Sequence, residues 1–229
     1  MNILIRGFYI ICVFCFLIDS NSLEAKKAAI VIDFDTKEVL FEVNADTRNY
    51  PASLTKMMTL YIVFDYLEKG IFKENTSLSV SKTAASRSPS KLYLEAGTKI
   101  SVKDSILALI IKSANDVATV VAENISGTER EFAKLMTKYA KDLGMNQTTF
   151  KNASGLPNRA QMTTARDIAT LSHALIRDFP DHYKLFSLKE FVWKGKKYKT
   201  HNKLLLSYNG ADGIKTGYIK ASGFQLAFS

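Results

Sequence analysis

The stretch YPASLTKMMT, residues 50–59, places Ser53 three residues before Lys56, at the start of a strongly apolar run. The apolar residues that follow predict a helix from Ser53 to Glu68, which Gly70 ends. Residues at i and i+3 of a helix share one face, so the two side chains are expected to lie within reach of each other. An ammonium group is costly to bury without a partner, and a lysine at this position therefore suggests a paired, functional role.

The Ser53–Lys56 pair has the chemistry of an activated nucleophile. A serine hydroxyl attacks poorly until a base takes its proton, and a lysine that is desolvated near another cation can be that base. Ser53 also lies in the first helical turn, where free N–H groups favour a developing oxyanion. The S-x-x-K pattern is not specific by itself, because it recurs at Ser79–Lys82 and Ser88–Lys91, which we interpret as surface segments.

Strand-like runs lie at both ends of the chain, and helical periodicity lies between them. The predicted strands occupy residues 28–35, 38–44, 190–200 and 213–229, the last two as hairpins. Capping patterns predict that helices start at 101–104, 128–131 and 163–167. A further helix is expected over 116–124. Residues 76–100 are expected to be loop with short helical pieces. This order predicts an α+β domain whose two ends share one sheet, with helices inserted between them.

Ser113 and Asn115 lie in the sequence SAN between two apolar helices. A serine there could relay a proton, and an asparagine could hold both the lysine and a substrate amide. The alternative is an ordinary helix-capping turn, and S-x-N occurs again at Ser207–Asn209. The motif alone leaves both interpretations open.

Lys215, Thr216 and Gly217 lie in DGIKTGY, on a predicted strand near the end of the chain. Gly217 would let a ligand approach the backbone, and Lys215 would be the second cation that lowers the basicity of Lys56. The alternative is a surface strand that carries a lysine. The tripeptide KTG occurs once in the chain.

In the order S-x-x-K, S-x-N and K-T-G, these motifs form the set found in penicillin-binding proteins and class A β-lactamases. The chain resembles the low-molecular-mass penicillin-binding proteins, which are serine-type D-alanyl-D-alanine carboxypeptidases of the S11 type. The resemblance runs from about residue 26 to the last residue and includes SANDVA, LGMNQTTFKNASGLP and TTARDIA. It implies an α+β fold of the serine β-lactamase and penicillin-binding-protein type, with an antiparallel sheet formed by both chain ends and a helical subdomain inserted.

By this resemblance, Ser53 is expected to be the nucleophile, which forms an acyl-enzyme with the penultimate D-alanine of a peptidoglycan stem peptide. Lys56 is expected to be its general base. Ser113 would pass a proton toward the leaving D-alanine, and Asn115 would position Lys56 and the peptide. No metal or cofactor is implied.

The resemblance also implies how the substrate is held. Lys215 and Thr216 are expected to bind its carboxylate end, and the strand through Gly217 to pair with its backbone. The backbone N–H groups of Ser53 and Tyr218 would form the oxyanion hole. The implied ligands are peptidoglycan stem peptides and β-lactam antibiotics, with no nucleic acid.

The net charge of +9 suits a polyanionic envelope or an anionic membrane surface. Nucleic acid is the alternative partner, but the lysines are scattered, and the densest run, KGKKYK at 194–199, is interpreted as a hairpin turn with solvated lysines.

Residues 1–25 have a basic start, a twelve-residue apolar core and a polar exit, the pattern of a secretory signal peptide. An uncleaved anchor is the alternative. Cleavage after Ala25 would remove Cys12 and Cys15, the only cysteines, and would leave residues 26–229 as the catalytic domain. We expect the protein to be exported to the periplasm or cell envelope.

Three alternatives stay open beside the carboxypeptidase. A β-lactamase of the same fold is disfavoured, because the chain has no E-x-x-L-N segment and SAN departs from S-D-N. A D,D-endopeptidase would use the same residues. The sheet of the family normally has a fifth strand and then a helix, and the chain stops at Ser229. We therefore expect a C-terminally truncated domain, and an inactive relative is the third alternative. Peripheral membrane association is expected only with a C-terminal extension.

Other hydrolase classes fit less well. The chain has no G-x-S-x-G motif for an α/β-hydrolase. His173, His182 and His201 have no zinc-type spacing, so we expect surface or helix-packing roles for them.

Overall fold

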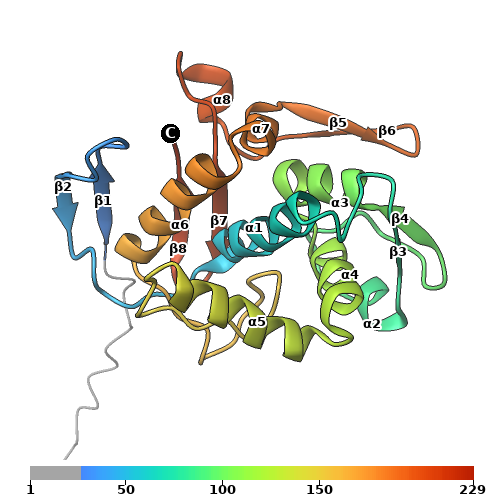
Figure 1. Ribbon diagram of the computed structural model, residues 1–229. Helices are drawn as coiled ribbons and strands as arrows, with labels where there is room; N and C mark the ends of the chain where they lie inside the picture. The colour runs from blue at the N-terminus through green and yellow to red at the C-terminus, as the bar shows by residue number, and fades with distance from the viewer. Residues whose placement is uncertain (1–26) are drawn as a thin grey trace, which may run out of the picture.

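The structure, a computed structural model, describes residues 27–229 (Figure 1). The predicted signal peptide lies outside these residues. The strands are β1 Ala29–Ile32, β2 Val39–Val43, β3 Ser77–Ser79, β4 Lys99–Ser101, β5 Glu190–Trp193, β6 Lys196–Lys199, β7 Lys215–Ile219 and β8 Gly223–Ala227. The helices are η1 Ala52–Leu54, α1 Thr55–Glu68, α2 Lys82–Ala85, α3 Val102–Leu107, η2 Ala108–Lys112, α4 Asn115–Ser126, α5 Glu129–Asp142, α6 Ala165–Asp178, α7 Pro180–Tyr183, η3 Lys184–Ser187 and α8 Leu204–Ser207.

The α+β class is confirmed, with helices between strands at both ends of the chain. The strands form four antiparallel two-stranded sheets, β1–β2, β3–β4, β5–β6 and β7–β8, and the connection between β3 and β4 contains α2. The prediction that both chain ends share one sheet is corrected in one respect. Within residues 27–229, β1–β2 and β7–β8 are separate two-stranded sheets, because no described strand is hydrogen-bonded between them.

Residues 76–100 are more regular than expected, since β3 and most of β4 fall within them. Each strand is three residues long and only Leu78 and Ile100 are buried, so little apolar alternation marks them in the sequence.

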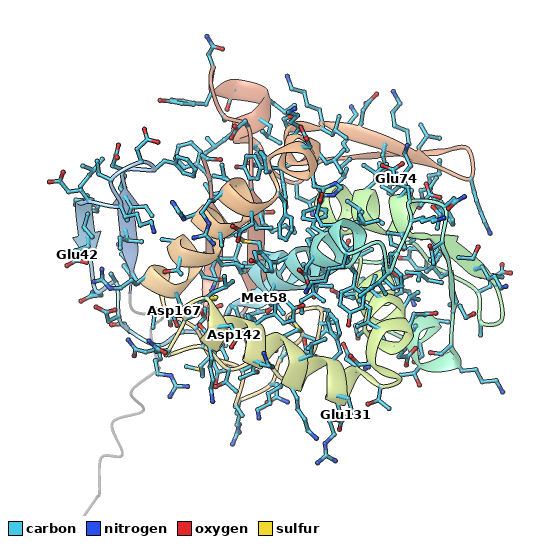
Figure 2. The ribbon with its side chains drawn as sticks, viewed as in Figure 1. Glu42, Met58, Glu74, Glu131, Asp142 and Asp167 are labelled. Carbon is cyan, nitrogen blue, oxygen red and sulfur yellow. The ribbon has the colours of Figure 1, made fainter. Side chains whose placement is uncertain are left out.

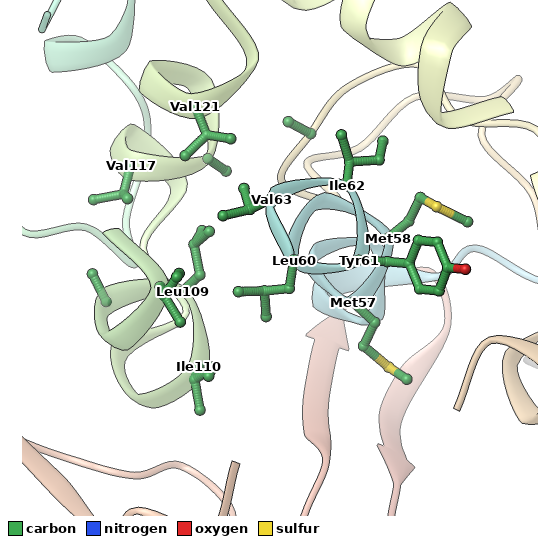
Figure 3. Close-up of a cluster of buried hydrophobic side chains, with 14 of the residues drawn as sticks. Met57, Met58, Leu60, Tyr61, Ile62, Val63, Leu109, Ile110, Val117 and Val121 are labelled. Carbon is green, nitrogen blue, oxygen red and sulfur yellow. The ribbon is translucent and has the colours of Figure 1, made fainter. Parts of the chain in front are cut away.

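Helix α1 runs through the centre of the molecule, and its residues from Thr55 to Phe64 are all buried (Figure 1). Leu60 and Val63 face Leu109 of η2 and the valines of α4, and the methionines of α1 fill the other side (Figure 3). Because α1 has no solvent face in its first turns, a polar residue there must find its partners inside the protein.

The predicted helix starts are confirmed by their caps. In each case a side-chain oxygen at the N-cap accepts a hydrogen bond from a backbone N–H in the first turn. The pairs are Ser101 with Asp104 for α3, Thr128 with Glu131 for α5, and Thr164 with Asp167 for α6.

The N-terminal hairpin is tied to α6 by Arg166, which forms ion pairs with Glu42 of β2 and with Asp46. Glu42 lies on the outer side of the molecule with other acidic surface residues, whereas Met58 and Asp167 lie inside (Figure 2). None of the helices in residues 27–229 is long and apolar enough to cross a membrane.

Candidate functional site

A cleft of about 670 Å³ opens where the start of α1, the turn between η2 and α4, and strand β7 meet. Its walls include Ser53, Ser113, Asn115, Thr216 and Gly217. The fold therefore brings together segments that carry the three motifs of the sequence.

Ser53 lies in η1, one turn before Lys56 in the first turn of α1. Lys56 is fully buried, and its Nζ donates to Ser53 Oγ at 3.2 Å, to Asn115 Oδ1 at 2.8 Å and to the carbonyl oxygen of Ser154 at 2.6 Å. Three acceptors match the three donors of an ammonium group. After losing one proton, Nζ could keep two of these bonds and accept the proton of Ser53.

Burial lowers the pKa of Lys56 well below its ordinary value, and the positive charge of Lys215 lowers it further. The carboxylates of Asp116 and Glu129 oppose this shift. A lowered pKa raises the share of the neutral amine at a given pH, and the neutral amine is the form that can act as a base.

Ser113 lies at the end of η2 in the left-handed conformation, with φ 57° and ψ 41°. Its Oγ is buried and has no hydrogen-bond partner among the described residues. Asn115 begins α4, and its Nδ2 donates to the carbonyl oxygen of Ser88 at 3.0 Å while its backbone N–H donates to that of Ser90 at 2.7 Å. The segment between α2 and β4, through Ser88 and Ser90, thus holds in place the Asn115 side chain that accepts from Lys56.

Strand β7 runs along η1 and leaves one edge free among the described strands, since it pairs only with β8. A Cβ added to Gly217 would lie 3.2 Å from the backbone nitrogen of Ser53, so glycine allows the strand to approach the serine this closely. Lys215 is 2% exposed, and burial lowers its pKa to about 7. Tyr218 is exposed on this strand beside Phe224.

The candidate residues named from the sequence contribute to one region, whereas the side chains of the repeated motifs do not; of those motifs, the Ser88 segment reaches the site through its backbone carbonyl. Ser79 and Lys82 are exposed, Lys91 Nζ donates to the carbonyl oxygen of Ala85, and Ser207 and Asn209 are exposed. His173 and His182 pack against Phe34 and Phe64, as expected.

His201 is exposed, as expected, and it also lines the cleft. Partial burial, with Lys215, Lys112 and Lys56, lowers its pKa. No motif marks it in the sequence.

The loop 152–155 is the other contribution that motif reasoning missed, because it acts through its backbone. Asn152 Oδ1 accepts from the N–H groups of Ser154 and Gly155, which shapes the loop. Gly155 has φ +88°, and an added Cβ would lie 1.7 Å from the carbonyl oxygen of Ala52. The glycine in NASGLP is the signal that could have identified this contact.

Comparison with known proteins agrees with this geometry. The family described as D-alanyl-D-alanine carboxypeptidase, peptidase family S11, matches residues 18–229. The chain is 38% identical over 219 residues to the D-alanyl-D-alanine carboxypeptidase DacC of Escherichia coli, an alignment that covers 93% of this chain and 54% of that relative. It spans about half the length of the first curated relatives that it matches.

Two solved structures are similar to most of this chain. The carboxypeptidase DacD of Francisella tularensis superposes with a TM-score of 0.85 at 32% identity, covering 98% of this chain and 64% of that one. Penicillin-binding protein D2 of Listeria monocytogenes, in its ampicillin-bound form, gives a TM-score of 0.77 at 33% identity, covering 86% and 81%. By motif order, fold and similarity, the chain belongs to the D-alanyl-D-alanine carboxypeptidase family, peptidase family S11.

Proposed function

We propose that residues 26–229 are the catalytic domain of a serine D,D-carboxypeptidase, which removes the terminal D-alanine of peptidoglycan stem peptides and is acylated by penicillins. The observation that carries the proposal is the buried Lys56, whose Nζ is hydrogen-bonded to Ser53 Oγ, Asn115 and Ser154 beside a second buried lysine.

Acylation begins with Lys56 as the neutral base. Its Nζ takes the proton of Ser53 as Oγ bonds to the carbonyl carbon of the penultimate D-alanine. The backbone N–H groups of Ser53 and Tyr218 stabilise the oxyanion. When the C–N bond breaks, the leaving amine of D-alanine takes a proton through Ser113, whose buried hydroxyl has no other partner among the described residues.

Substrate binding uses the free edge of β7. The peptide pairs with this strand, and Lys215 and Thr216 hold its terminal carboxylate. The carboxylate thus places an anion beside the buried Lys215 ammonium, which is costly to bury alone. A water molecule then attacks the acyl-enzyme carbonyl and releases the shortened peptide from Ser53 Oγ.

The same site is proposed to bind β-lactams. Support comes from the Listeria monocytogenes neighbour, whose solved forms hold ampicillin and cefotaxime. We also propose that residues 1–25 direct export, so that the domain works outside the cytoplasm, where family members meet peptidoglycan.

The test is intact-mass spectrometry of the purified chain after brief exposure to benzylpenicillin, followed over time, with Ser53→Ala as control. A long-lived adduct of one whole penicillin that is absent from Ser53→Ala, together with D-alanine release from a peptide ending in D-alanyl-D-alanine, is the expected result. An adduct that vanishes within seconds while the antibiotic is consumed would indicate a β-lactamase instead. A folded chain that neither forms an adduct nor releases D-alanine would overturn the proposal.

A further inference from the structure

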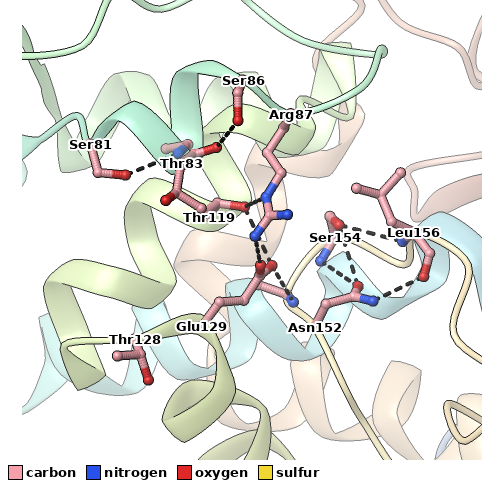
Figure 4. A network of polar contacts seen from close by, with 12 residues as sticks. Ser81, Thr83, Ser86, Arg87, Thr119, Thr128, Glu129, Asn152, Ser154 and Leu156 are labelled. Carbon is pink, nitrogen blue, oxygen red and sulfur yellow. Dashed lines mark hydrogen bonds and ion pairs between the residues drawn. The ribbon is translucent and has the colours of Figure 1, made fainter.

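A polar network connects the segment after α2, helices α4 and α5 and the loop that carries Ser154 (Figure 4). Arg87, in the segment after α2, forms an ion pair with Glu129 Oε2 at the start of α5, and its Nε donates to Thr119 Oγ1 of α4 at 2.9 Å. The other oxygen of Glu129, Oε1, accepts from the backbone N–H of Ala153 at 3.0 Å and from Thr119 at 3.3 Å.

This ion pair is largely enclosed, since 12% of the Glu129 side chain and 29% of the Arg87 side chain are exposed. Enclosed ion pairs contribute little net stability compared with apolar packing, so this one calls for another explanation. Exposed pairs, such as Lys134–Glu131 on the same helix α5, need no such explanation.

Each segment that the network joins also holds a group of the candidate site. Glu129 accepts from the backbone N–H of Ala153, and the next residue, Ser154, provides the carbonyl that accepts from Lys56. The carbonyl of Ala153 accepts from Thr59 of α1 at 2.8 Å. The Arg87 segment continues into Ser88, whose carbonyl accepts from Asn115. Two of the three acceptors around Lys56 Nζ are therefore held from behind by one charged pair.

We propose that Arg87 and Glu129 are positioning residues of the acylation site, which hold the Ser154 carbonyl and Asn115 at Lys56 and set the charge balance there. This inference rests on the proposed function, because it assigns the pair a role in positioning the acceptors around Lys56, the proposed base. Neither residue lines the cleft, so the pair acts through the groups it holds.

The charge of the pair gives a readout that packing alone would not change. The charged groups that act on Lys56 are Lys215 of β7, Asp116 of α4 and Glu129 of α5, and the charge of Lys56 in turn acts on His201 in the cleft wall. Glu129 raises the pKa of Lys56. Because Arg87 is ion-paired with Glu129, its positive charge is expected to offset part of that effect. Removing Glu129 and removing Arg87 should therefore move the basicity of Lys56 in opposite directions.

The experiment measures the rate constant for acylation by a fluorescent penicillin as a function of pH, in the wild-type chain and in Glu129→Gln, Arg87→Gln and the control Glu131→Gln. The control removes an exposed carboxylate two residues further along the same first turn of α5. Thermal melts verify that each variant is folded.

Both site variants should lower the alkaline plateau of the rate by about tenfold or more, because the base is held less firmly. The acid limb should move to lower pH in Glu129→Gln and to higher pH in Arg87→Gln, each by roughly half a pH unit or more. Glu131→Gln should leave both unchanged.

If the wild type is acylated and the folded variants keep its alkaline plateau and its acid limb, the inference about Arg87 and Glu129 is overturned, and the proposed function stands. Equal limb shifts in the same direction, or a fall in the plateau without any limb shift, would reduce the pair to ordinary packing and overturn the charge role. A wild-type chain that is not acylated on Ser53 would instead overturn the proposed function. If Glu129→Gln fails to fold, the direction of the limb shift in Arg87→Gln still decides.

Discussion

Lys215 shows at the scale of one residue how the site costs stability. Its pKa is about 7 in the folded protein because of burial, against 10.5 for the ordinary group. Between these values the unfolded chain binds more protons than the native one, so the free energy of unfolding rises with pH. The cost of burying Lys215 is fully present below the folded pKa and disappears as pH rises toward 10.5.

Replacing this lysine should therefore stabilise the fold while it weakens the site. We expect Lys215→Met to raise the free energy of unfolding by about 1–4 kcal/mol near neutral pH, with the gain shrinking at alkaline pH. Urea unfolding at neutral and at alkaline pH measures this gain in the free energy of unfolding. The rate of acylation by penicillin should fall in the same variant. The exposed Lys199→Met on β6 is the control. A gain of the same size at both pH values would mean that titration of Lys215 is not its source.

At the scale of elements, the approach of the 152–155 loop to η1 depends on Gly155. Gly144 offers a matched comparison, since it has φ +87° with nothing within 4 Å of an added Cβ, whereas Gly155 has φ +88° and meets the Ala52 carbonyl. Gly144→Ala should cost roughly 1–2 kcal/mol for the left-handed conformation alone. Gly155→Ala should cost more and should slow acylation, because the loop that carries the Ser154 carbonyl must move away.

Melting temperatures and acylation rates of the two variants provide the comparison. Equal losses of stability, with acylation unaffected in Gly155→Ala, would show that the contact with Ala52 does not position the loop.

The elements also show how much the sequence could reveal. Helices α3, α5 and α6 were predictable because apolar periodicity and capping residues agree along each of them, and α1 and α4 because of their apolar runs alone, since neither has a side-chain cap. The strand pair β3–β4 was not predictable, because six residues with two buried side chains leave no readable pattern.

The site divides along the same line. Ser53, Lys56, Ser113, Asn115 and Lys215 were predictable because their side chains form recurring motifs. The carbonyl of Ser154, the Arg87–Glu129 pair and the place of His201 were not, because a backbone acceptor leaves no motif and an ion pair 42 residues apart leaves no local signal.

At the scale of the whole molecule, the two terminal hairpins, β1–β2 and β7–β8, should differ in local stability. All five residues of β2 are exposed, and β1–β2 is a separate two-stranded sheet, whereas β7–β8 packs on η1 and buries Lys215, Gly217 and Ala227. Isolated hairpins are marginally stable in water.

We therefore expect the amides of β1–β2 to exchange with solvent faster than those of β7–β8 by on the order of 100-fold, and faster still than those of α1. Hydrogen exchange followed by mass spectrometry of peptides measures this. Equal protection of the two hairpins would contradict the expectation and would show that Arg166 is enough to hold β2 in place.

The contacts of Lys56 also bear on when activity arises as the chain folds. Its acceptors on Asn115 and Ser154 lie 59 and 98 residues away in sequence, and β7 joins the cleft from still further along. Contacts between distant residues require the closure of long loops, so they form late in folding. The reactive serine would thus stay inert on a partly folded chain, and covalent capture of penicillin would count only molecules whose last segments have docked. Such labelling could serve as a clock for the end of folding, independent of any spectroscopic signal.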